Sequence, residues 1–499
     1  MEKISKETVR IGNIIRITGE TALIEGTAKL QSENAELSSV LECSALAEVL
    51  SASAGEGSAG VEGKARFSVV YLDKTGDIRS FDNECSFLCN IENSSVVSGM
   101  TVLPSVSVLE CSAKPADGGV FMRALINIEL CCVKNTELEA VTEETAEGLE
   151  TLVMEASVPE VLAAKTAKLY VNAETSPCAP CREVLLSRAY CILRKLTCES
   201  GKLVLEGDIR FSALYIPDDA SQPFLSYEET LPFGEILQED ACIGDEIEVY
   251  ADLKPERLGA EHNGEGFAVS AVIGVSYVIT KPCRRRFVSD LYSPLFECVP
   301  KSRRIDCSTL VLKPPAKRLM RLSLKVPDSY PAAARVISSS ATAQISSVSP
   351  GDTPGKLGVT GVIAANLCYS TADAGIRSIR QNLPFEAEIP GGSENEVTPY
   401  AEYVEAECVG DEIELKVSME FTVTEKNSES FDILTDLEID RSAPVSSPGI
   451  VIYYPDSGEK LWDAAKRFRC DTDVLLRENG LEREALTSRA EKKLFIIHG

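Results

Sequence analysis

Three stretches of this sequence repeat one pattern: VEGKARFSVVY (residues 61–71), LEGDIRFSALY (205–215) and VTGVIAANLCY (359–369). In each stretch a glycine is followed eight residues later by a tyrosine, and every second residue between them is apolar. Alternation with a period of two is typical of a β-strand that has one face in a protein core. The pattern therefore predicts three equivalent half-buried strands whose tyrosines are structural.

The similarity extends to both sides of each glycine. A pair of branched apolar residues precedes the glycine by 23 to 25 residues, and a phenylalanine (Phe87, Phe233 or Phe385) follows it by 24 to 26 residues. A long alternating strand then closes each copy, and a turn signal such as Asn263-Gly264 precedes that strand. We interpret the three copies as one β-rich module that occurs three times.

The spacing of the copies indicates how the modules are organised. The equivalent glycines are 144 and 154 residues apart, which is too long for a solenoid repeat and suits tandem independent domains. The predicted modules cover residues 1–140, 156–287 and 318–440. An acidic stretch (137–155), which we expect to be helical, joins the first two. A basic stretch (281–325), with twelve Lys/Arg against three Asp/Glu, joins the second and third.

The last fifty residues follow a different pattern. A linker rich in proline and serine (441–449) precedes an apolar strand, IVIYYP, and two capped amphipathic segments, SGEKLWDAAKRF and CDTDVLLRENG; KKLFII follows near the end of the chain. These segments predict a βααβ unit over residues 450–499. The predicted fold class is therefore mainly β, with three tandem β-rich modules followed by one small βααβ domain.

The charge balance is acidic, since 77 Asp and Glu against 50 Lys and Arg give a formal net charge of −27. This balance argues against a nucleic-acid partner, because neutralising phosphates requires a basic surface. No apolar run approaches 18 residues, so we expect no membrane span. The first residues lack the apolar segment of a signal peptide, and we therefore expect a cytoplasmic protein.

Motifs that carry chemistry are few. The sequence has two histidines and lacks the GxxxxGK[ST] phosphate-binding loop, nucleophile elbows and HExxH zinc motifs, so we expect no enzymatic activity, cofactor or metal. Seventeen cysteines, an odd number without a secretory signal, argue against a disulfide framework. Cys178 and Cys181 leave two interpretations open: a redox or metal-binding pair, or a proline-rich turn.

The C-terminal unit resembles LysM domains. Residues 458–462 (GEKLW) stand where that family has Gly-Asp/Glu-Ser/Thr-Leu-Trp, and Asn479 stands at the family's usual asparagine. The chain differs from the family at residues 489–492 (RAEK), where LysM domains have Pro-Gly-Gln in a loop that holds N-acetylglucosamine. The resemblance implies a binding site that comprises Ser457, Gly458, Glu459, Leu461, Trp462 and Asn479.

The residues of this unit also have purely structural interpretations. Trp462 follows Leu461 one turn into an amphipathic helix, which favours packing in a core over stacking on a sugar ring. Asn479-Gly480 suits the C-terminal cap of a helix, because glycine readily adopts the left-handed backbone conformation.

Three such modules followed by one LysM-like unit resemble the SPOCS-domain proteins, and in full architecture the spore coat morphogenetic proteins of spore-forming Clostridia. The fold class that this resemblance implies is three SPOCS-like modules and a LysM domain. It implies a mother-cell protein that binds the coat's basement-layer ATPase and other coat proteins and tethers the coat to the forespore surface.

The basic stretch offers a second candidate site. Arg284, Arg285, Arg286, Arg303 and Arg304 are suited to dock an acidic partner, because guanidinium groups bind carboxylates with two hydrogen bonds. An equally good interpretation is that they pair with acidic residues of the chain itself.

The predicted function is that of a scaffold, because several rigid surfaces in one chain raise the effective concentration of neighbouring sites. The alternative is a LysM-type protein that binds peptidoglycan, a polymer containing N-acetylglucosamine, at the cortex or cell wall.

Overall fold

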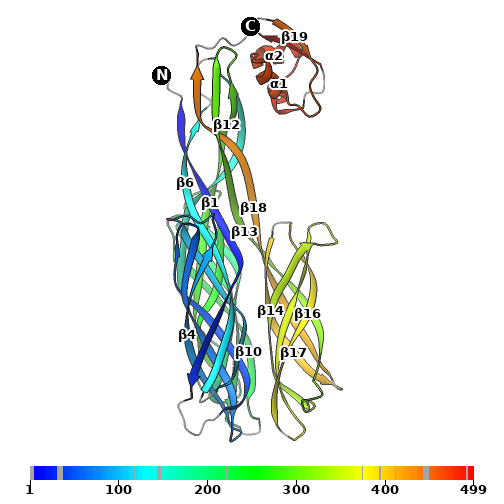
Figure 1. The fold of residues 1–499 in the computed structure, drawn as a ribbon. Helices are drawn as coiled ribbons and strands as arrows, with labels where there is room; N and C mark the ends of the chain where they lie inside the picture. The colour runs from blue at the N-terminus through cyan, green and yellow to red at the C-terminus, as the bar shows by residue number, and fades with distance from the viewer. Residues whose placement is uncertain are drawn as a thin grey trace.

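The structure is a computed structural model, and it describes residues 5–30, 37–116, 119–142, 148–176, 178–219, 222–373, 375–392, 395–410, 412–441, 449–489 and 493–498. The fold is mainly β, as predicted. Figure 1 shows an elongated molecule in which long strands run along the main axis and both helices belong to a small unit at one end.

Each of the three repeated units consists of six antiparallel strands in two three-stranded sheets. In module 1 the sheets have the strand orders β1-β6-β5 and β2-β3-β4. Its strands are β1 (Lys6–Lys29), β2 (Leu37–Ala54), β3 (Ser58–Asp73), β4 (Ile78–Glu92), β5 (Thr101–Ala116) and β6 (Gly119–Val141).

Modules 2 and 3 repeat this topology strand for strand. The strands of module 2 are β7 (Glu150–Glu174), β8 (Cys181–Glu199), β9 (Lys202–Pro217), β10 (Leu225–Gln238), β11 (Glu248–His262) and β12 (Phe267–Tyr292). The strands of module 3 are β13 (Glu297–Lys325), β14 (Arg335–Pro350), β15 (Lys356–Ser370), β16 (Ile376–Pro390), β17 (Asn395–Val409) and β18 (Glu412–Asp440). The first and sixth strands of a module therefore always share a sheet, as do its second, third and fourth.

The repeated glycine is required because an aromatic ring covers it. Gly207 lies opposite Phe233 in the sheet, and a Cβ atom on Gly207 would lie 2.8 Å from that ring and 2.4 Å from the carbonyl oxygen of Ile192. The same arrangement recurs in the other two modules, as Gly63 with Phe87 and Gly361 with Phe385. The glycine and the phenylalanine of the sequence pattern thus form one contact, a ring packed on bare backbone.

The alternating residues of the repeat fill the core between the two sheets of each module, as predicted. In module 1, for example, Ala65 and Phe67 of β3 face Met122 and Ile126 of β6, and all four are fully buried. The repeated tyrosines are buried as well, which confirms that they are structural; they are Tyr71, Tyr215 and Tyr369.

The first and last strands of each module continue beyond its core as a two-stranded ribbon, and the three ribbons together form a stalk, seen in the upper half of Figure 1. Apolar residues from all three modules form the stalk core, among them Leu138, Val158, Phe287, Ile305 and Ile433. The ribbons consist of residues 6–14 with 133–141, residues 150–159 with 282–292, and residues 297–309 with 427–440.

The two segments that were predicted to be connectors contribute strands to the stalk. The prediction of a helix over residues 137–155 is wrong, because residues 137–141 end β6 and residues 150–155 begin β7. Leu138 and Ala140 are buried while Glu137 and Glu139 are exposed, so the segment has the two-residue period of a strand. The basic stretch 281–325 likewise forms the end of β12 and the whole of β13.

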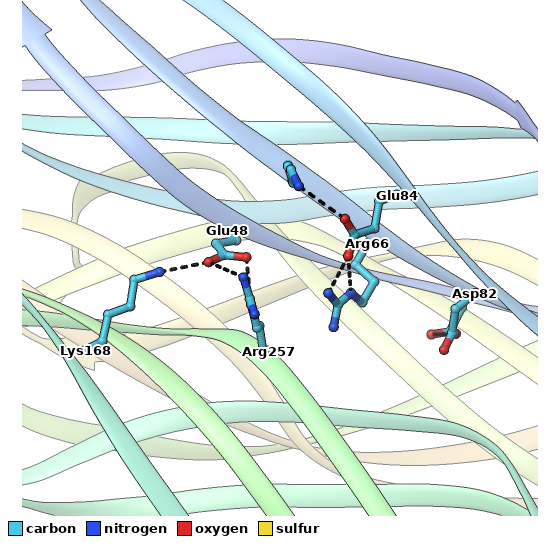
Figure 2. A network of polar contacts seen from close by, with 8 residues as sticks. Glu48, Arg66, Asp82, Glu84, Lys168 and Arg257 are labelled. Atoms are coloured by element: carbon cyan, nitrogen blue, oxygen red, sulfur yellow. Dashed lines mark hydrogen bonds and ion pairs between the residues drawn. The ribbon is translucent and has the colours of Figure 1, made fainter.

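The three modules pack against one another, in contrast to the independent domains expected from their spacing. Leu41 of module 1, Leu185 of module 2 and Cys368 of module 3 share one buried cluster. Ion pairs add to these contacts. Figure 2 shows Glu48 of module 1, which accepts hydrogen bonds of 2.8 Å each from Lys168 and Arg257 of module 2.

A second junction joins all three modules. The Arg16 side chain of module 1 forms an ion pair with Glu396 of module 3 and donates a 2.6 Å hydrogen bond to the Tyr250 hydroxyl of module 2. The Arg16 side chain is 7% exposed, so this charge is compensated within the protein. The modules therefore behave as one body with shared polar and apolar contacts.

The C-terminal unit has the predicted βααβ order with one added 3₁₀ turn. Asp471 caps the second helix by accepting a hydrogen bond from the Val474 amide, and Gly480 ends that helix with a φ of 62°. Residues 442–448 of the predicted linker lie outside the described residues. The elements are β19 (Gly449–Tyr453), α1 (Leu461–Phe468), α2 (Thr472–Asn479), η1 (Arg483–Thr487) and β20 (Leu494–His498).

Among the described residues one disulfide bond is present, although the cysteine count argued against a disulfide framework. It joins Cys198 at the end of β8 to Cys242, which lies shortly before β11. The other fifteen cysteines are free, and several of them, including Cys131, Cys191 and Cys368, are buried as small apolar residues.

Candidate binding surfaces

The C-terminal unit rests on the tip of the stalk through the only tryptophan of the chain. Trp462 is 2% exposed, and its indole Nε1 donates a 2.8 Å hydrogen bond to the Asp290 carboxylate of β12. The indole also packs edge-on against Tyr292, with ring centroids 5.0 Å apart. Lys466 donates to both oxygens of the same carboxylate, at 2.6 and 2.7 Å. Asp290 therefore holds helix α1 by two side chains.

Further contacts surround this docking site, which we call the seat and define as Asp290 and Tyr292 of β12 with Trp462 and Lys466 of α1. The Tyr292 hydroxyl donates a 2.6 Å hydrogen bond to the carbonyl oxygen of Cys470, and burial raises the pKa of this tyrosine far above its ordinary value. Thr472 donates to the Glu150 carboxylate, whose pKa burial raises. At the rim, Arg469 forms a 2.8 Å ion pair with Glu297. The unit is thus docked in one orientation.

Three of the residues taken from the LysM pattern have structural roles. Leu461 and Trp462 are buried, which confirms that the tryptophan packs in a core, although part of that core belongs to the stalk. The Asn479 side chain bridges α2 and β20: its amide group donates to the carbonyl oxygens of Leu475 and Phe495, and its oxygen accepts from the Phe495 amide. The polar groups of Trp462 and Asn479 are therefore already satisfied within the protein.

The other three residues lie in the loop between β19 and α1. Ser457 and Gly458 are exposed. The Glu459 carboxylate accepts a 2.7 Å hydrogen bond from the Tyr453 hydroxyl and pairs with Arg467. Burial alone would raise its pKa, but these hydrogen bonds and charges hold it below the ordinary value. Ser457 and Gly458 are thus the two of the six residues that lie fully at the surface, and Gly458 adopts a left-handed backbone conformation with a φ of 91°.

This loop meets the loop in which the chain departs from the LysM pattern. Lys460 and Arg489 form an isolated antiparallel bridge. Residues 490–492 lie outside the described residues, so the remainder of that loop is not placed. The two loops expected to hold a sugar are consequently neighbours.

The sheet of the C-terminal unit presents an apolar face that sequence analysis did not single out. Ile450 lies opposite Ile497 and Ile452 lies opposite Phe495, and all four side chains are exposed, Ile450 at 74% and Ile452 at 55%. Tyr454, which follows the strand, is exposed as well. The alternation in IVIYYP and LFII was the available signal, because one face of a two-stranded sheet that packs on helices must point away from them.

A groove of about 630 Å³ continues this apolar face toward the stalk tip. Ile450, Val474 and Ile497 of the C-terminal unit line it together with Leu295, which lies between β12 and β13, and with Arg469 and Asp471. Leu295 is 66% exposed, so apolar surface of the stalk adjoins that of the C-terminal unit. We call Ile450, Ile452, Phe495 and Ile497 the apolar face below.

The five arginines of the basic stretch are exposed but lie on two ribbons: Arg284, Arg285 and Arg286 on β12, and Arg303 and Arg304 on β13. Arg304 pairs with Asp306 at 3.5 Å. Arg284, Arg285 and Arg303 make no ion pair with the residues that the structure describes. Arg284 nevertheless lines a cavity of about 300 Å³ together with Glu246 and Glu248.

Three lysines of the basic stretch pair with carboxylates of module 3. Lys301 pairs with Glu438, Lys313 with Glu425, and Lys317 with Glu402. These pairs favour the interpretation in which the stretch neutralises acidic residues of its own chain. The five arginines lie on two different ribbons, and of them only Arg284 is among the residues that line the two cavities described here.

Cys178 lies in the connection between β7 and β8, and Cys181 is the first residue of β8. Burial raises the pKa of both thiols above the ordinary value, which disfavours the thiolate that redox and metal chemistry require. Across the described ranges, no group of three or more His, Cys, Asp or Glu side chains is arranged to hold a metal ion.

Among the described residues, no helix is both long enough and apolar enough to cross a membrane. Comparison of the chain with protein-family models, with curated proteins and with solved structures finds no match.

Proposed function

We propose that this chain is a non-enzymatic scaffold of the spore coat that links coat proteins to the forespore surface of the mother cell through protein–protein contacts. The proposal takes its biological setting from the resemblance to SPOCS and LysM domains. The observation that carries it is the apolar face of the C-terminal unit, which lies exposed beside the groove at the stalk tip.

The composition of this face favours a protein partner over a glycan. Exposed apolar side chains that adjoin one another are typical of protein interaction sites. Trp462 is buried, and the side-chain amide of Asn479 makes its hydrogen bonds within the unit. Two of the six residues that the resemblance implies for a sugar site, Trp462 and Asn479, are therefore occupied within the protein.

The way in which the unit is mounted also suits a scaffold. A docked unit presents its apolar face in a fixed direction relative to the stalk and the modules, so a partner bound there is held near partners bound elsewhere. The coat's basement-layer ATPase is the partner that the resemblance supplies for this face.

The experiment uses the full chain as bait in lysate from sporulating mother cells. The test variant carries Ile452→Lys and Phe495→Lys, which place two charges on the apolar face. The matched control carries Glu482→Lys, an exposed position of the same unit outside that face. We expect the wild type and the control to recover the basement-layer ATPase and the test variant to recover at least tenfold less.

Equal recovery by the test variant, with unchanged Trp462 fluorescence as proof of folding, would refute a docking role for this face. The alternative function, peptidoglycan binding, draws on the exposed Ser457 and Gly458 and on the contact between the two loops at Lys460 and Arg489. Titration of the full chain with N-acetylglucosamine oligomers tests it. Micromolar binding that the Ile452→Lys and Phe495→Lys changes leave intact would favour the glycan.

A further inference from the structure

Module 1 contains two thiols that face each other between its sheets. Cys43 belongs to β2 and Cys111 to β5, and their Sγ atoms lie 3.1 Å apart. Both side chains pack against the core of module 1. Sulfur atoms at this distance need little movement to form a covalent bond, because the two cysteines already approach each other from separate sheets.

The position of Cys43 has an equivalent in each of the other modules, where it is a serine. The equivalence follows from the register, since each partner lies six residues after the repeated glycine. The pairs are Cys43 with Val69, Ser187 with Ala213, and Ser339 with Leu367.

In module 3 this serine links the same two strands. The Ser339 hydroxyl donates a 2.7 Å hydrogen bond to the carbonyl oxygen of Val404 on β17, the strand that corresponds to β5. A contact between the second and fifth strands at this position therefore occurs in two modules. In module 1 both partners are thiols, which can form a covalent bond.

Module 2 has its disulfide on the same edge. Cys198 ends β8, which corresponds to β2, and Cys242 lies shortly before β11, which corresponds to β5. One module of this chain thus already joins its second strand to the region of its fifth by a disulfide.

We propose that Cys43 and Cys111 are a disulfide-forming pair that closes module 1 between β2 and β5. The oxidant is a small-molecule disulfide of the glutathione class. The Cys43 thiolate attacks one sulfur of the oxidant, which releases one thiolate and leaves a mixed disulfide on Cys43. The Cys111 thiolate then attacks the Cys43 sulfur and releases the second thiolate. The two protons of the protein thiols end on the two released thiolates, so two electrons pass from the protein to the oxidant.

The environment of the pair sets the rate of this reaction. The hydrogen bond with Cys111, together with burial, raises the pKa of Cys43 well above its ordinary value. The thiolate fraction therefore rises about tenfold for each pH unit between pH 7 and pH 9, and we expect the rate of oxidation of the folded chain to follow it.

The test starts from the reduced full chain, incubated at pH 9 with glutathione disulfide until the Cys198–Cys242 link is complete. Remaining thiols are alkylated, and the digest is analysed by mass spectrometry. We expect a peptide pair joined through Cys43 and Cys111, and a midpoint of thermal unfolding about 5 °C above that of Cys43→Ser treated in the same way. Cys43→Ser introduces the residue that modules 2 and 3 have there, so we expect this variant to fold.

The Cys198–Cys242 link serves as the internal control for oxidation. Recovery of Cys43 and Cys111 as alkylated thiols in a sample where that link is complete would overturn the proposal. A link from Cys43 to any other cysteine would overturn it as well. The proposal is independent of the proposed scaffold function, because it concerns module 1 alone.

Discussion

The three modules and the C-terminal unit are attached in different ways. Each module contributes two strands to a common stalk, and the modules share an apolar cluster and ion pairs such as that of Glu48 with Lys168. The C-terminal unit rests mainly on the end of one ribbon, where Asp290 and Tyr292 of module 2 receive Trp462. The modules are therefore parts of one folding unit. The C-terminal unit is held mainly by one docking contact, and we expect a few substitutions there to release it.

The largest effect is expected from a change inside a module. In Gly207→Ala the new Cβ atom meets the Ile192 carbonyl oxygen and the Phe233 ring, so strand and ring must both shift. We expect a loss of about 3 kcal/mol in the free energy of unfolding, measured by chemical denaturation. The control is Gly234→Ala in β10, where the nearest atom lies 4.0 Å away. Equal losses for the two variants would show that the ring contact is unimportant.

The next largest effect should separate the C-terminal unit from the stalk without unfolding the modules. Asp290→Ala leaves the buried Trp462 nitrogen without its acceptor and removes the partner of Lys466. We expect docking to weaken by about 2 kcal/mol. Because Trp462 is the only tryptophan, its fluorescence emission should shift to longer wavelength while far-ultraviolet circular dichroism stays constant. An unchanged emission spectrum would mean that the seat does not depend on Asp290.

A smaller effect concerns the contact between modules 1 and 2 and depends on pH. Burial alone would raise the pKa of Glu48, but the hydrogen bonds from Arg257 and Lys168 hold it below the ordinary value of 4.5. The charged carboxylate therefore stabilises the folded state above pH 4.5, and this contribution is lost as the pH falls through the lower pKa of the folded protein.

We expect Glu48→Gln to lose about 1 kcal/mol at pH 7 and to depend less on pH than the wild type below pH 4.5. Denaturation curves of both proteins between pH 3 and pH 7 provide the measurement. Parallel curves over the whole range would contradict a role for the Glu48 charge.

The smallest effect is expected at the rim of the seat. Glu297 and Arg469 form an ion pair whose side chains are 49% and 32% exposed. Glu297→Gln should change docking by only about 0.3 kcal/mol, because water and salt screen exposed pairs. Its Trp462 emission should match that of the wild type. A shift as large as that of Asp290→Ala would place the main attachment at the rim.

The modules could be predicted from the sequence because their signals are local and occur three times. Gly207 and Phe233 are 26 residues apart, and the alternation around Phe211 gives the buried face directly. The stalk was not predicted, because residues 137–155 and 281–325 stand out by their charge, and this charge was given more weight than their alternating apolar residues. The alternation of Leu138 and Ala140 with Glu137 and Glu139 was present, but it was interpreted as an acidic connector.

The candidate site was predicted only in part. The βααβ order, the burial of Trp462 and the cap at Gly480 follow from local pattern and helix chemistry. Asp290 could not be identified, because it lies 172 residues before Trp462 and no local signal marks one exposed-looking aspartate as the acceptor of an indole. The contact of Tyr292 with Cys470 could not be predicted for the same reason, because these two residues are 178 positions apart.

The pairing of first with last strands in every ribbon also determines the order of events during synthesis. Lys6 pairs with Val141 and Glu297 pairs with Asp440, so no ribbon can close until its module has been translated completely. The stalk core then waits for module 3, which supplies Ile305 and Ile433. The seat for Trp462 is made chiefly of module 2 and is complete well before the ribosome reaches that tryptophan. The docking surface of the C-terminal unit is thus synthesised before the unit itself, and we expect docking to be the last step of folding.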